Sequence, residues 1–581
     1  MAYDIILGRD NSDKKKFGKE GLIYLGKGYV TMGNYTSMSN NIYLDVARSH
    51  VILVAGKRGC LVGGTLVFTD KGYKRIKDFN QVLDKILSFN KENMNFEWER
   101  AELLKYEVKN EKLLQIELEN NKELILTKEH PLLITIGKSQ LSLLWRKGED
   151  LKKGDKLLEL NNSFDGLKPI RIKEIKEINN VSEVYDLSVS KNHSFIANGI
   201  ISHNSGKSYS IGVIAEEISN LPPELSRNIA PIIFDTMGIF WTMKFKNEKE
   251  KSILDEWKLE PKSSPIKVFA PIGKLEEYKE KNIPVDEAFA LKASELEAED
   301  WIITFNVSMT SQEGVLITNT ISKLKEEKDS FTIQDIIKQV EHTHNISQET
   351  KNIVNSLFQS AESWGIFSKS SEGIEITDLI NAGKTTIIDL SVYSSIGTFN
   401  VRGLVIGLVS RKIFTQRMNA RKQEEIQSIQ HGIDYMSYNP TRETPLVWLF
   451  IDESHEFLPK NGKTPATDAL VQILREGRQP GISLVLATQQ PGQIHNDVMT
   501  QSDIVISHRV TSKPDIEALN QIMQSYLLEN IKTSMDKLPS SKGSAIILDD
   551  NSERIYPMRM RPRLTWHGGE SPSAVKGQSS L

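Results

Sequence analysis

Two separated stretches, Val51–Gly59 (VILVAGKRG) and Ser205–Ile218 (SGKSYSIGVIAEEI), decide how this sequence is interpreted. The first is a short apolar run that opens a glycine-rich loop. The second completes such a loop and continues with the apolar spacing of a helix. Joined end to end, they give a strand, Gly-x-x-x-x-Gly-Lys-Ser and a helix, which is the context that a phosphate-binding loop requires. The sequence therefore predicts a nucleotide-binding loop cut in two by residues 60–204.

The intervening segment begins with Cys60 and ends with His203-Asn204, and Ser205 follows it. Taken alone, the cysteine would be read as an ordinary buried residue and the asparagine as a turn residue. Together they supply a thiol nucleophile, a side-chain amide that can cyclise, and a hydroxyl nucleophile. Because removal of this segment also rebuilds another motif, we interpret it as a self-excising insert in a precursor.

Length, charge and cysteine count limit the class of protein to which both parts can belong. The insert takes 145 of the 581 residues and leaves 436, so each part is long enough to bury a core. The chain has 73 Lys and Arg against 76 Asp and Glu, so no basic field indicates nucleic acid. The single cysteine excludes a disulfide framework and favours a reducing compartment. No apolar run approaches the roughly 18–20 residues of a membrane span, and the N-terminus does not resemble a signal peptide. We therefore expect a cytoplasmic protein without a membrane partner.

The hydrophobic pattern divides the chain into three regions with different expected secondary structure. Residues 1–50 contain short strand-like runs at Gly21–Tyr24 and Ile42–Val46, which we interpret as a small β lead-in. The insert is expected to be mostly β, with strands at Leu113–Leu118, Glu123–Thr127, Val184–Val189 and Ser194–Ile201. The remainder has an α/β pattern, with buried strands at Val51–Ala55, Pro231–Asp235, Lys384–Leu390, Leu446–Asp452 and Ser483–Thr488. Helical spacing covers Ile303–Leu324, Phe331–Phe358 and Val401–Arg417. The polar stretch Arg421–Glu443 is expected to be a surface loop or a frayed helix, and residues 567–581 lack the apolar side chains to fold.

Residues of the rejoined loop predict phosphate chemistry. Its backbone N–H groups and the following helix N-terminus would surround the phosphates of ATP. Lys207 would reach the β- and γ-phosphates, and the Ser208 hydroxyl would bind Mg²⁺. The other residues expected around the nucleotide are Gly56, Lys57, Arg58, Gly59, Ser205, Gly206 and Tyr209.

A second acidic pair completes the predicted ATPase site. The apolar run Leu446–Ile451 ends in Asp452 and Glu453. Asp452 would hold Mg²⁺ through water, and Glu453 would activate the attacking water. The alternative is that the pair merely caps a helix. Gln489, at the end of another apolar run, is a candidate γ-phosphate sensor, although it could equally be a chance strand terminus.

Three arginines flank this region, Arg475, Arg478 and Arg509. One of them could reach the ATP of a neighbouring subunit. Unless the protein is oligomeric, the simpler interpretation of each is a solvated surface arginine.

The insert resembles the inteins over its whole length. The matching stretches are Cys60–Thr65, Thr127–His130, Trp145, Leu151–Asp155, Val184–Val189, His193 and Asn198–Asn204. The resemblance implies an all-β horseshoe (Hint) fold. At 145 residues there is no room for a homing endonuclease, so residues 60–204 resemble a mini-intein.

This resemblance also implies roles for the first step of splicing. Cys60 would attack the Gly59 carbonyl and convert the peptide bond to a thioester. His130 would donate a proton to the departing amide nitrogen, and Thr127 would hydrogen-bond the strained peptide.

The later steps use the other end of the insert. Ser205 would attack the thioester, with Asp186 coordinating this transfer. The Asn204 side chain would then cyclise and release the insert, assisted by His203 and His193. No cofactor or metal is expected for splicing.

The rest of the chain resembles the HerA–FtsK branch of P-loop ATPases, most closely the archaeal HerA-type helicases. The stretches that carry this resemblance are the interrupted loop, Ile451–Phe457, Gly383–Ser391, Arg475–Arg478, Ala487–Pro491 and Arg561–Arg563. The sequence departs from the family where Asp235 is followed by Thr-Met-Gly-Ile without the usual glutamate, and at Gln490, where relatives have an arginine.

The HerA resemblance implies a RecA-like domain of residues 51–59 plus 205–566, with a mostly parallel sheet flanked by helices. It also implies a homo-hexameric ring that translocates double-stranded DNA, with a partner nuclease in DNA end processing. Two alternatives stay open: a conjugation- or packaging-type DNA pump, and a nucleotide-binding regulatory or scaffolding protein that does not translocate.

Overall fold

The computed structural model describes residues 4–32, 35–56, 61–80, 83–90, 95–99, 101–107, 113–120, 122–127, 130–136, 142–148, 151–161, 167–178, 183–189, 194–203, 207–369, 376–393, 400–430, 444–508, 510, 513–523, 534–535, 538–539 and 543–567. Two compact units emerge from the contacts: residues 1–56 with 207–567, here called the host unit, and residues 57–206, here called the insert unit. Each is described by itself.

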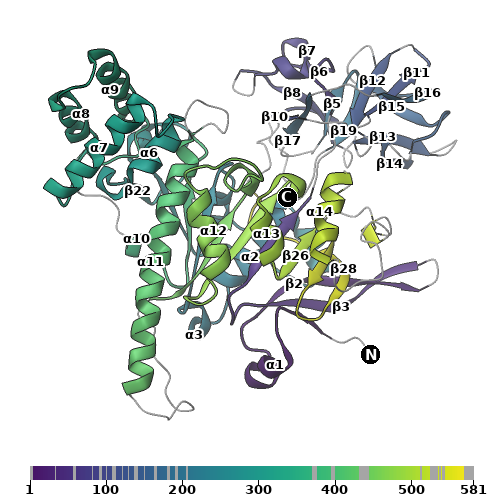
Figure 1. Ribbon diagram of the computed structural model, residues 1–581. Coiled ribbons are helices and arrows are strands. Elements are labelled where there is room, and N and C mark those ends of the chain that lie inside the picture. The colour runs from purple at the N-terminus through teal and green to yellow at the C-terminus, as the bar shows by residue number, and fades with distance from the viewer. Residues whose placement is uncertain are drawn as a thin grey trace. The chain divides into compact units, whose positions relative to one another are not determined.

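Thirteen strands in the described part of the host unit form one sheet (Figure 1). They are β1 (Ile5–Leu7), β2 (Leu22–Met32), β3 (Tyr35–Asp45), β4 (Val51–Ala55), β20 (Ile229–Asp235), β21 (Ile266–Pro271), β22 (Glu287–Phe289), β23 (Thr385–Asp389), β24 (Leu446–Ile451), β25 (Ile482–Thr488), β26 (Ile504–Ser507), β27 (Ser544–Asp549) and β28 (Arg554–Met560). Their order is β1-β3-β2-β28-β27-β26-β4-β25-β24-β20-β23-β21-β22. From β26 to β22 every pairing is parallel, and β27, β28, β2 and β3 continue the sheet in antiparallel fashion. The predicted parallel sheet is therefore confirmed for its central strands.

Helices cover both faces of this sheet. They are α1 (Asn11–Phe17), α2 (Lys207–Ser219), α3 (Pro223–Ser226), α4 (Lys251–Glu256), α5 (Leu275–Glu280), α6 (Ala298–Phe305), α7 (Gln312–Glu327), α8 (Ile333–His342), α9 (Gln348–Ser363), α10 (Ile376–Leu379), α11 (Val401–Gln430), α12 (Thr467–Glu476), α13 (Asn496–Gln501) and α14 (Lys513–Met523). The helices α6 to α9 form a cluster of their own beside α11 (Figure 1).

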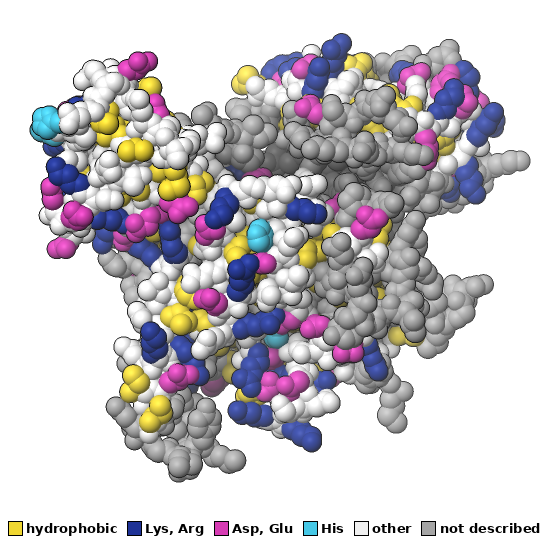
Figure 2. Space-filling view, viewed as in Figure 1, with side chains coloured by type: hydrophobic (Ala, Val, Ile, Leu, Met, Phe, Trp, Pro, Cys, Tyr) yellow, Lys and Arg dark blue, Asp and Glu magenta, His cyan; other side chains and the backbone are white. Residues whose placement is uncertain are grey.

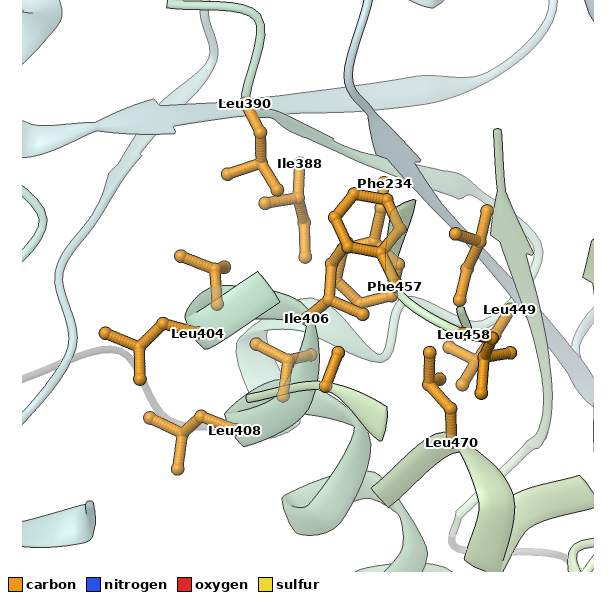
Figure 3. Packing of buried hydrophobic residues seen from close by; sticks show 14 of the residues in the cluster. Phe234, Ile388, Leu390, Leu404, Ile406, Leu408, Leu449, Phe457, Leu458 and Leu470 are labelled. Carbon is orange, nitrogen blue, oxygen red and sulfur yellow. The ribbon is translucent and has the colours of Figure 1, made fainter. Parts of the chain in front are cut away.

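Alternation along the strands explains this layering. Val51, Leu53 and Ala55 of β4 point into the core that contains α11 and α12, whereas Ile52 and Val54 point into the core that contains α2. All five are buried, as a strand covered on both faces requires. Figure 3 shows the first core, where Phe234 and Leu449 of the sheet meet Ile406 of α11 and Leu470 of α12.

Several predicted helix boundaries were wrong, because single capping residues end or begin helices inside long apolar patterns. The helix predicted over Ile303–Leu324 is two helices, since Asn306 adopts a left-handed conformation that ends α6 and Ser311 caps α7. The helix predicted over Phe331–Phe358 is likewise two, with Ser347 capping α9. The helix predicted to end at Arg417 continues to Gln430, and Arg421–Gln430 is therefore helical; residues 431–443 lie outside the described residues.

The N-terminal lead-in is longer than predicted. Its two short runs belong to the eleven-residue strands β2 and β3, which form a hairpin with register shifts at Gly26 and Tyr29. β2 pairs with β28, so these strands extend the host sheet, and α1 was not predicted.

The described part of the insert unit contains strands and a short 3₁₀ turn. The strands are β5 (Leu61–Val62), β6 (Leu66–Thr69), β7 (Gly72–Arg75), β8 (Ile86–Asn90), β9 (Asn95–Glu99), β10 (Ala101–Glu107), β11 (Leu113–Leu118), β12 (Glu123–Thr127), β13 (Pro131–Ile136), β14 (Ser142–Lys147), β15 (Lys156–Leu160), β16 (Leu167–Ile178), β17 (Glu183–Val189), β18 (Ser194–Ala197) and β19 (Ile200–His203). The prediction that the insert is mostly β is confirmed for the described residues, and so is the β11–β12 hairpin. The strand predicted at Ser194–Ile201 is instead the hairpin β18–β19, because Asn198 and Gly199 both have positive φ, at 48° and 88°.

Candidate nucleotide-binding and splicing sites

Polar side chains gather at the carboxyl ends of the central host strands. Asp235 ends β20 and Asp389 ends β23, while Asp452 follows β24 and Gln489 follows β25. β4, which leads toward the interrupted loop, lies beside β25, and the Gly56 N–H donates to the Thr488 carbonyl at 3.2 Å. This edge is where ligands bind in open parallel sheets.

The acidic pair after β24 is held in an unusual backbone geometry. Asp452 is buried, and its Oδ1 accepts the Glu453 N–H at 2.9 Å. Glu453 has φ 50° and ψ 40°, a left-handed conformation that costs a non-glycine residue free energy. This turn sends the Glu453 carboxylate back toward β25, where Gln489 Nε2 donates a hydrogen bond to Oε1. The structure thus brings together the predicted base and the predicted sensor.

A histidine that the sequence interpretation did not single out borders the same carboxylate. His455 Nδ1 lies 3.7 Å from Glu453 Oε2 and 3.2 Å from Thr488 Oγ1. The sequence placed His455 only within the matched stretch Ile451–Phe457, and its contact with the Glu453 carboxylate depends on the left-handed turn at Glu453.

Helix α2, which carries Lys207 and Ser208, is bound by residues 561–565 through hydrogen bonds to Glu216. Glu216 is fully buried and accepts from Arg561 at 3.1 Å, from Arg563 Nε at 2.9 Å and from two backbone N–H groups of the same segment. Burial raises the pKa of Glu216, but the two guanidinium groups outweigh it, so the pKa is lowered.

The first turn of α2 is held in the same way. The Arg563 N–H donates to the Tyr209 hydroxyl at 2.7 Å, and that hydroxyl donates to Glu250 at 3.1 Å. Burial raises the pKa of Tyr209, which therefore stays a neutral phenol. The Arg-Pro-Arg stretch noted in the sequence thus positions helix α2.

Two carboxyl groups form a buried pair beside this edge. Asp235 and Asp389 are directly paired in register on β20 and β23 and are both fully buried. Burial, and then the charge of Asp389, raises the pKa of Asp235 to about 7, and burial raises the pKa of Asp389. Asp235 accepts three backbone N–H bonds, from Met237, Gly238 and Phe240, and these bonds shape the loop that follows β20.

The candidate finger arginines have partners on the host surface. Arg475 Nε donates to Asp497 at 2.7 Å, and Arg478 donates to the Gln501 carbonyl at 2.8 Å. Both side chains are exposed. These contacts match the surface interpretation of the two arginines, while Arg509 lies outside the described residues.

The insert unit collects the predicted splicing segments. Leu61, which follows Cys60, pairs with Leu126 and Tyr185, the neighbours of Thr127 and Asp186. Ser202, which precedes His203, pairs with Leu132 on β13, the strand that follows His130.

Two of the predicted splicing residues are described in full. Thr127 and His130 are both buried, and the His130 N–H donates to the Thr127 carbonyl at 3.0 Å. The insert strands therefore bring the matched stretches together from distant positions in the sequence.

The other predicted site residues lie outside the described residues or are described by their backbones alone. Lys57, Arg58, Gly59, Cys60, His193, Asn204, Ser205 and Gly206 lie outside the described residues. Asp186, His203, Lys207 and Ser208 belong to β17, β19 and α2 by their backbones, and their side chains are not described.

Family comparisons connect the host unit to a known group. The model of the helicase HerA central domain matches residues 205–409, and the zonular occludens toxin (Zot) model matches residues 394–516. The first match begins at Ser205, the residue that follows the insert. The host unit is thus similar to the HerA helicases, and this similarity covers residues 205–409 in the family model.

Curated relatives agree with this assignment. A probable DNA double-strand break repair helicase HerA of Methanocaldococcus jannaschii is 28% identical over 152 residues, covering 23% of this chain and 30% of that protein. The DNA double-strand break repair helicase HerA of Saccharolobus solfataricus is 22% identical over 360 residues, covering 59% of each. The chain thus spans between about a third and three-fifths of the length of these relatives.

Solved structures were also matched. An intein from a hyperthermophile is 20% identical, covering 25% of this chain and 99% of that chain at a TM-score of 0.23. A DnaB intein from Synechocystis is 22% identical, covering 26% and 99% at a TM-score of 0.22. Among the described residues, none of the helices is both long and apolar enough to cross a membrane.

Proposed function

We propose that this HerA-type chain is a precursor that excises residues 60–204 and thereby joins Gly59 to Ser205, giving an ATP-hydrolysing motor with a continuous phosphate loop. The observation that carries the ATPase part is the Glu453 carboxylate held by Gln489 at the carboxyl ends of β24 and β25, beside β4. A base and a sensor in contact, next to the strand that enters a phosphate loop, suit hydrolysis better than simple nucleotide storage.

In the proposed hydrolysis, ATP lies at the N-terminus of α2 with Lys207 on its β- and γ-phosphates. Glu453 takes a proton from a water molecule whose oxygen attacks the γ-phosphorus. The bond to the β-phosphate oxygen breaks, and its electron pair stays on ADP. Gln489 reports the γ-phosphate to Glu453 through their shared hydrogen bond.

Mg²⁺ fits the residues that would hold it. Asp452 is a buried carboxylate at a strand end, and Ser208 contributes a hydroxyl, which is the oxygen donor set that Mg²⁺ prefers. When bound, the ion would neutralise charge on the phosphates.

The proposed excision needs only groups of the chain. Cys60 Sγ attacks the Gly59 carbonyl, the peptide bond breaks, and the released nitrogen takes a proton from His130, with Thr127 supporting the strained peptide. Ser205 Oγ then displaces Cys60 from the thioester, with Asp186 coordinating the exchange of the two nucleophiles.

Two further steps finish the reaction. The Asn204 amide nitrogen attacks its own carbonyl, which breaks the bond to Ser205 and leaves a cyclic imide on the insert, while His203 and His193 transfer protons. The freed Ser205 amine attacks the ester carbonyl, regenerating the hydroxyl and forming the Gly59–Ser205 peptide bond.

The partners of the motor are proposed from its relatives. The names of the curated relatives support double-stranded DNA and DNA end processing, and we propose a homo-hexamer working with a nuclease. Lys and Arg are interspersed with Asp and Glu on the face shown in Figure 2, and we propose that DNA is held by a local surface such as a ring lumen. A DNA pump of the conjugation type and a non-translocating nucleotide-binding scaffold remain the alternatives.

ATP turnover with and without linear double-stranded DNA tests this function. We expect turnover that rises with DNA and is abolished by Glu453→Gln. Tight nucleotide binding with negligible turnover would favour the scaffold, and turnover unchanged in Glu453→Gln would contradict the assigned base.

A further inference from the structure

The turn after β24 places His455 against β25. Residues Ser454–Glu456 form a single 3₁₀ turn, and Ser454 Oγ donates to the Ala487 carbonyl at 2.8 Å. Ser454 is fully buried, so this bond ties the turn to the neighbouring strand. Together with the left-handed Glu453, it fixes where the His455 ring lies.

The ring of His455 lies between two polar groups of the site. Its Nδ1 is 3.2 Å from Thr488 Oγ1 and 3.7 Å from Glu453 Oε2. Thr488 is itself fixed, because its Oγ1 accepts the Gln490 N–H at 3.0 Å and its side chain is buried. A proton on Nδ1 would be donated to Thr488 Oγ1 and would present a positive edge to the carboxylate.

The Glu453 carboxylate is therefore bordered on both sides. Gln489 donates to Oε1, and His455 faces Oε2 from the direction of Thr488. A carboxylate that is held at one oxygen by a hydrogen bond and bordered at the other by a fixed ring has fewer open rotamers than one held at a single oxygen, and a general base must be held close to its productive geometry.

We propose that His455 is a positioning residue for ATP hydrolysis, which orients the general base Glu453 through Nδ1 against the fixed Thr488 hydroxyl. This inference rests on the proposed ATPase function. His455 touches neither water nor phosphate in this scheme. Glu453 still accepts the proton of the attacking water, and His455 sets the direction in which its carboxylate points.

Three substitutions distinguish positioning from mere packing. His455→Asn places an amide nitrogen the same number of bonds from the backbone as Nδ1, so it keeps the contact with Thr488. His455→Gln has a similar size but carries its amide one bond farther out. His455→Ala removes the group altogether.

Each variant is made in the full chain, the mass of the purified product is recorded, and kcat and KM for ATP are measured. We expect His455→Ala and His455→Gln to lower kcat by about 10- to 100-fold, with KM changed less than about twofold, because the nucleotide contacts are untouched. His455→Asn should recover most of the lost kcat.

Two outcomes would overturn the proposal: wild-type kcat in His455→Ala, or a His455→Asn variant no better than His455→Gln. Glu453→Gln separates this failure from a wrong functional assignment. If the unsubstituted protein hydrolyses no ATP, or Glu453→Gln turns over normally, the ATPase site is wrong and the inference falls with it.

Discussion

His50, the residue before β4, offers a quantitative test of how the host unit is held together. Its Nδ1 lies 2.6 Å from Asp503 Oδ2, and its Nε2 lies 3.6 Å from Asp45 Oδ2. The ring is buried, and Asp45 is also paired with Arg9. Burial lowers the pKa of His50, but the hydrogen bonds to Asp45 and Asp503 outweigh it and raise the pKa to about 9.

The sign of the pH dependence follows from this value. The imidazole has a pKa of about 6.5 in the unfolded chain, so folding favours the protonated ring. The resulting stability is fully present below about pH 6.5 and is lost as the pH rises through about 9. A difference of about 2.5 pKa units corresponds to about 3 kcal/mol, most of it lost between pH 6 and pH 9.5.

The perturbation is His50→Gln, which keeps a polar side chain but cannot be protonated. Urea denaturation of the host unit, followed by tryptophan fluorescence, is compared between the unsubstituted protein and the variant at pH 6 and pH 9.5. Trp448 lies 6.4 Å from the His50 ring and reports this part of the sheet. The variant should be less stable at pH 6, by about 3 kcal/mol more than at pH 9.5. An equal deficit at both pH values would refute a charged His50.

Three further predictions concern the same unit. The raised pKa of Asp235 gives the host stability that is lost as the pH rises through about 7. Asp389→Asn should therefore make the unfolding free energy decrease less between pH 5 and pH 8 than it does in the unsubstituted protein. An equal decrease in both proteins would contradict the buried pair. Glu216→Ala should destabilise the host by about 3–5 kcal/mol, because Arg561 and Arg563 lose their buried counter-charge; a loss under about 1 kcal/mol in urea denaturation would contradict that network. Lys207→Ala should abolish ATP turnover, with the Lys463→Ala surface variant as the matched control, and wild-type turnover in Lys207→Ala would exclude the assigned loop.

The strands were predictable where one simple pattern decides them. Val51–Ala55 and Leu446–Ile451 are continuous apolar runs because both of their faces are buried, and the structure places them as β4 and β24. Helix ends were less predictable. The breaks at Asn306 and Ser347 depend on single capping residues inside long apolar patterns.

Most residues of the candidate site could be predicted from the sequence, but most of their contacts could not. Asp452 and Glu453 could be found from sequence because they end a strand, but the contact of Glu453 with Gln489 needs the order β25-β24 and a left-handed backbone. The hydrogen bonds of Arg561 and Arg563 to Glu216 join residues about 350 positions apart in the sequence, and no local sequence pattern predicts these bonds. The pairing of Asp235 with Asp389 likewise depends on which strands are neighbours.

The central claim is that residues 60–204 remove themselves and join the two halves of a phosphate loop. Intact-mass analysis of the expressed chain tests it most directly. The account predicts two products, a joined host of 436 residues and a free insert of 145 residues, and a single full-length species of 581 residues when Cys60→Ala and Asn204→Ala are combined. A full-length mass for the unsubstituted chain, with the Gly59–Cys60 and Asn204–Ser205 bonds intact, would contradict the account.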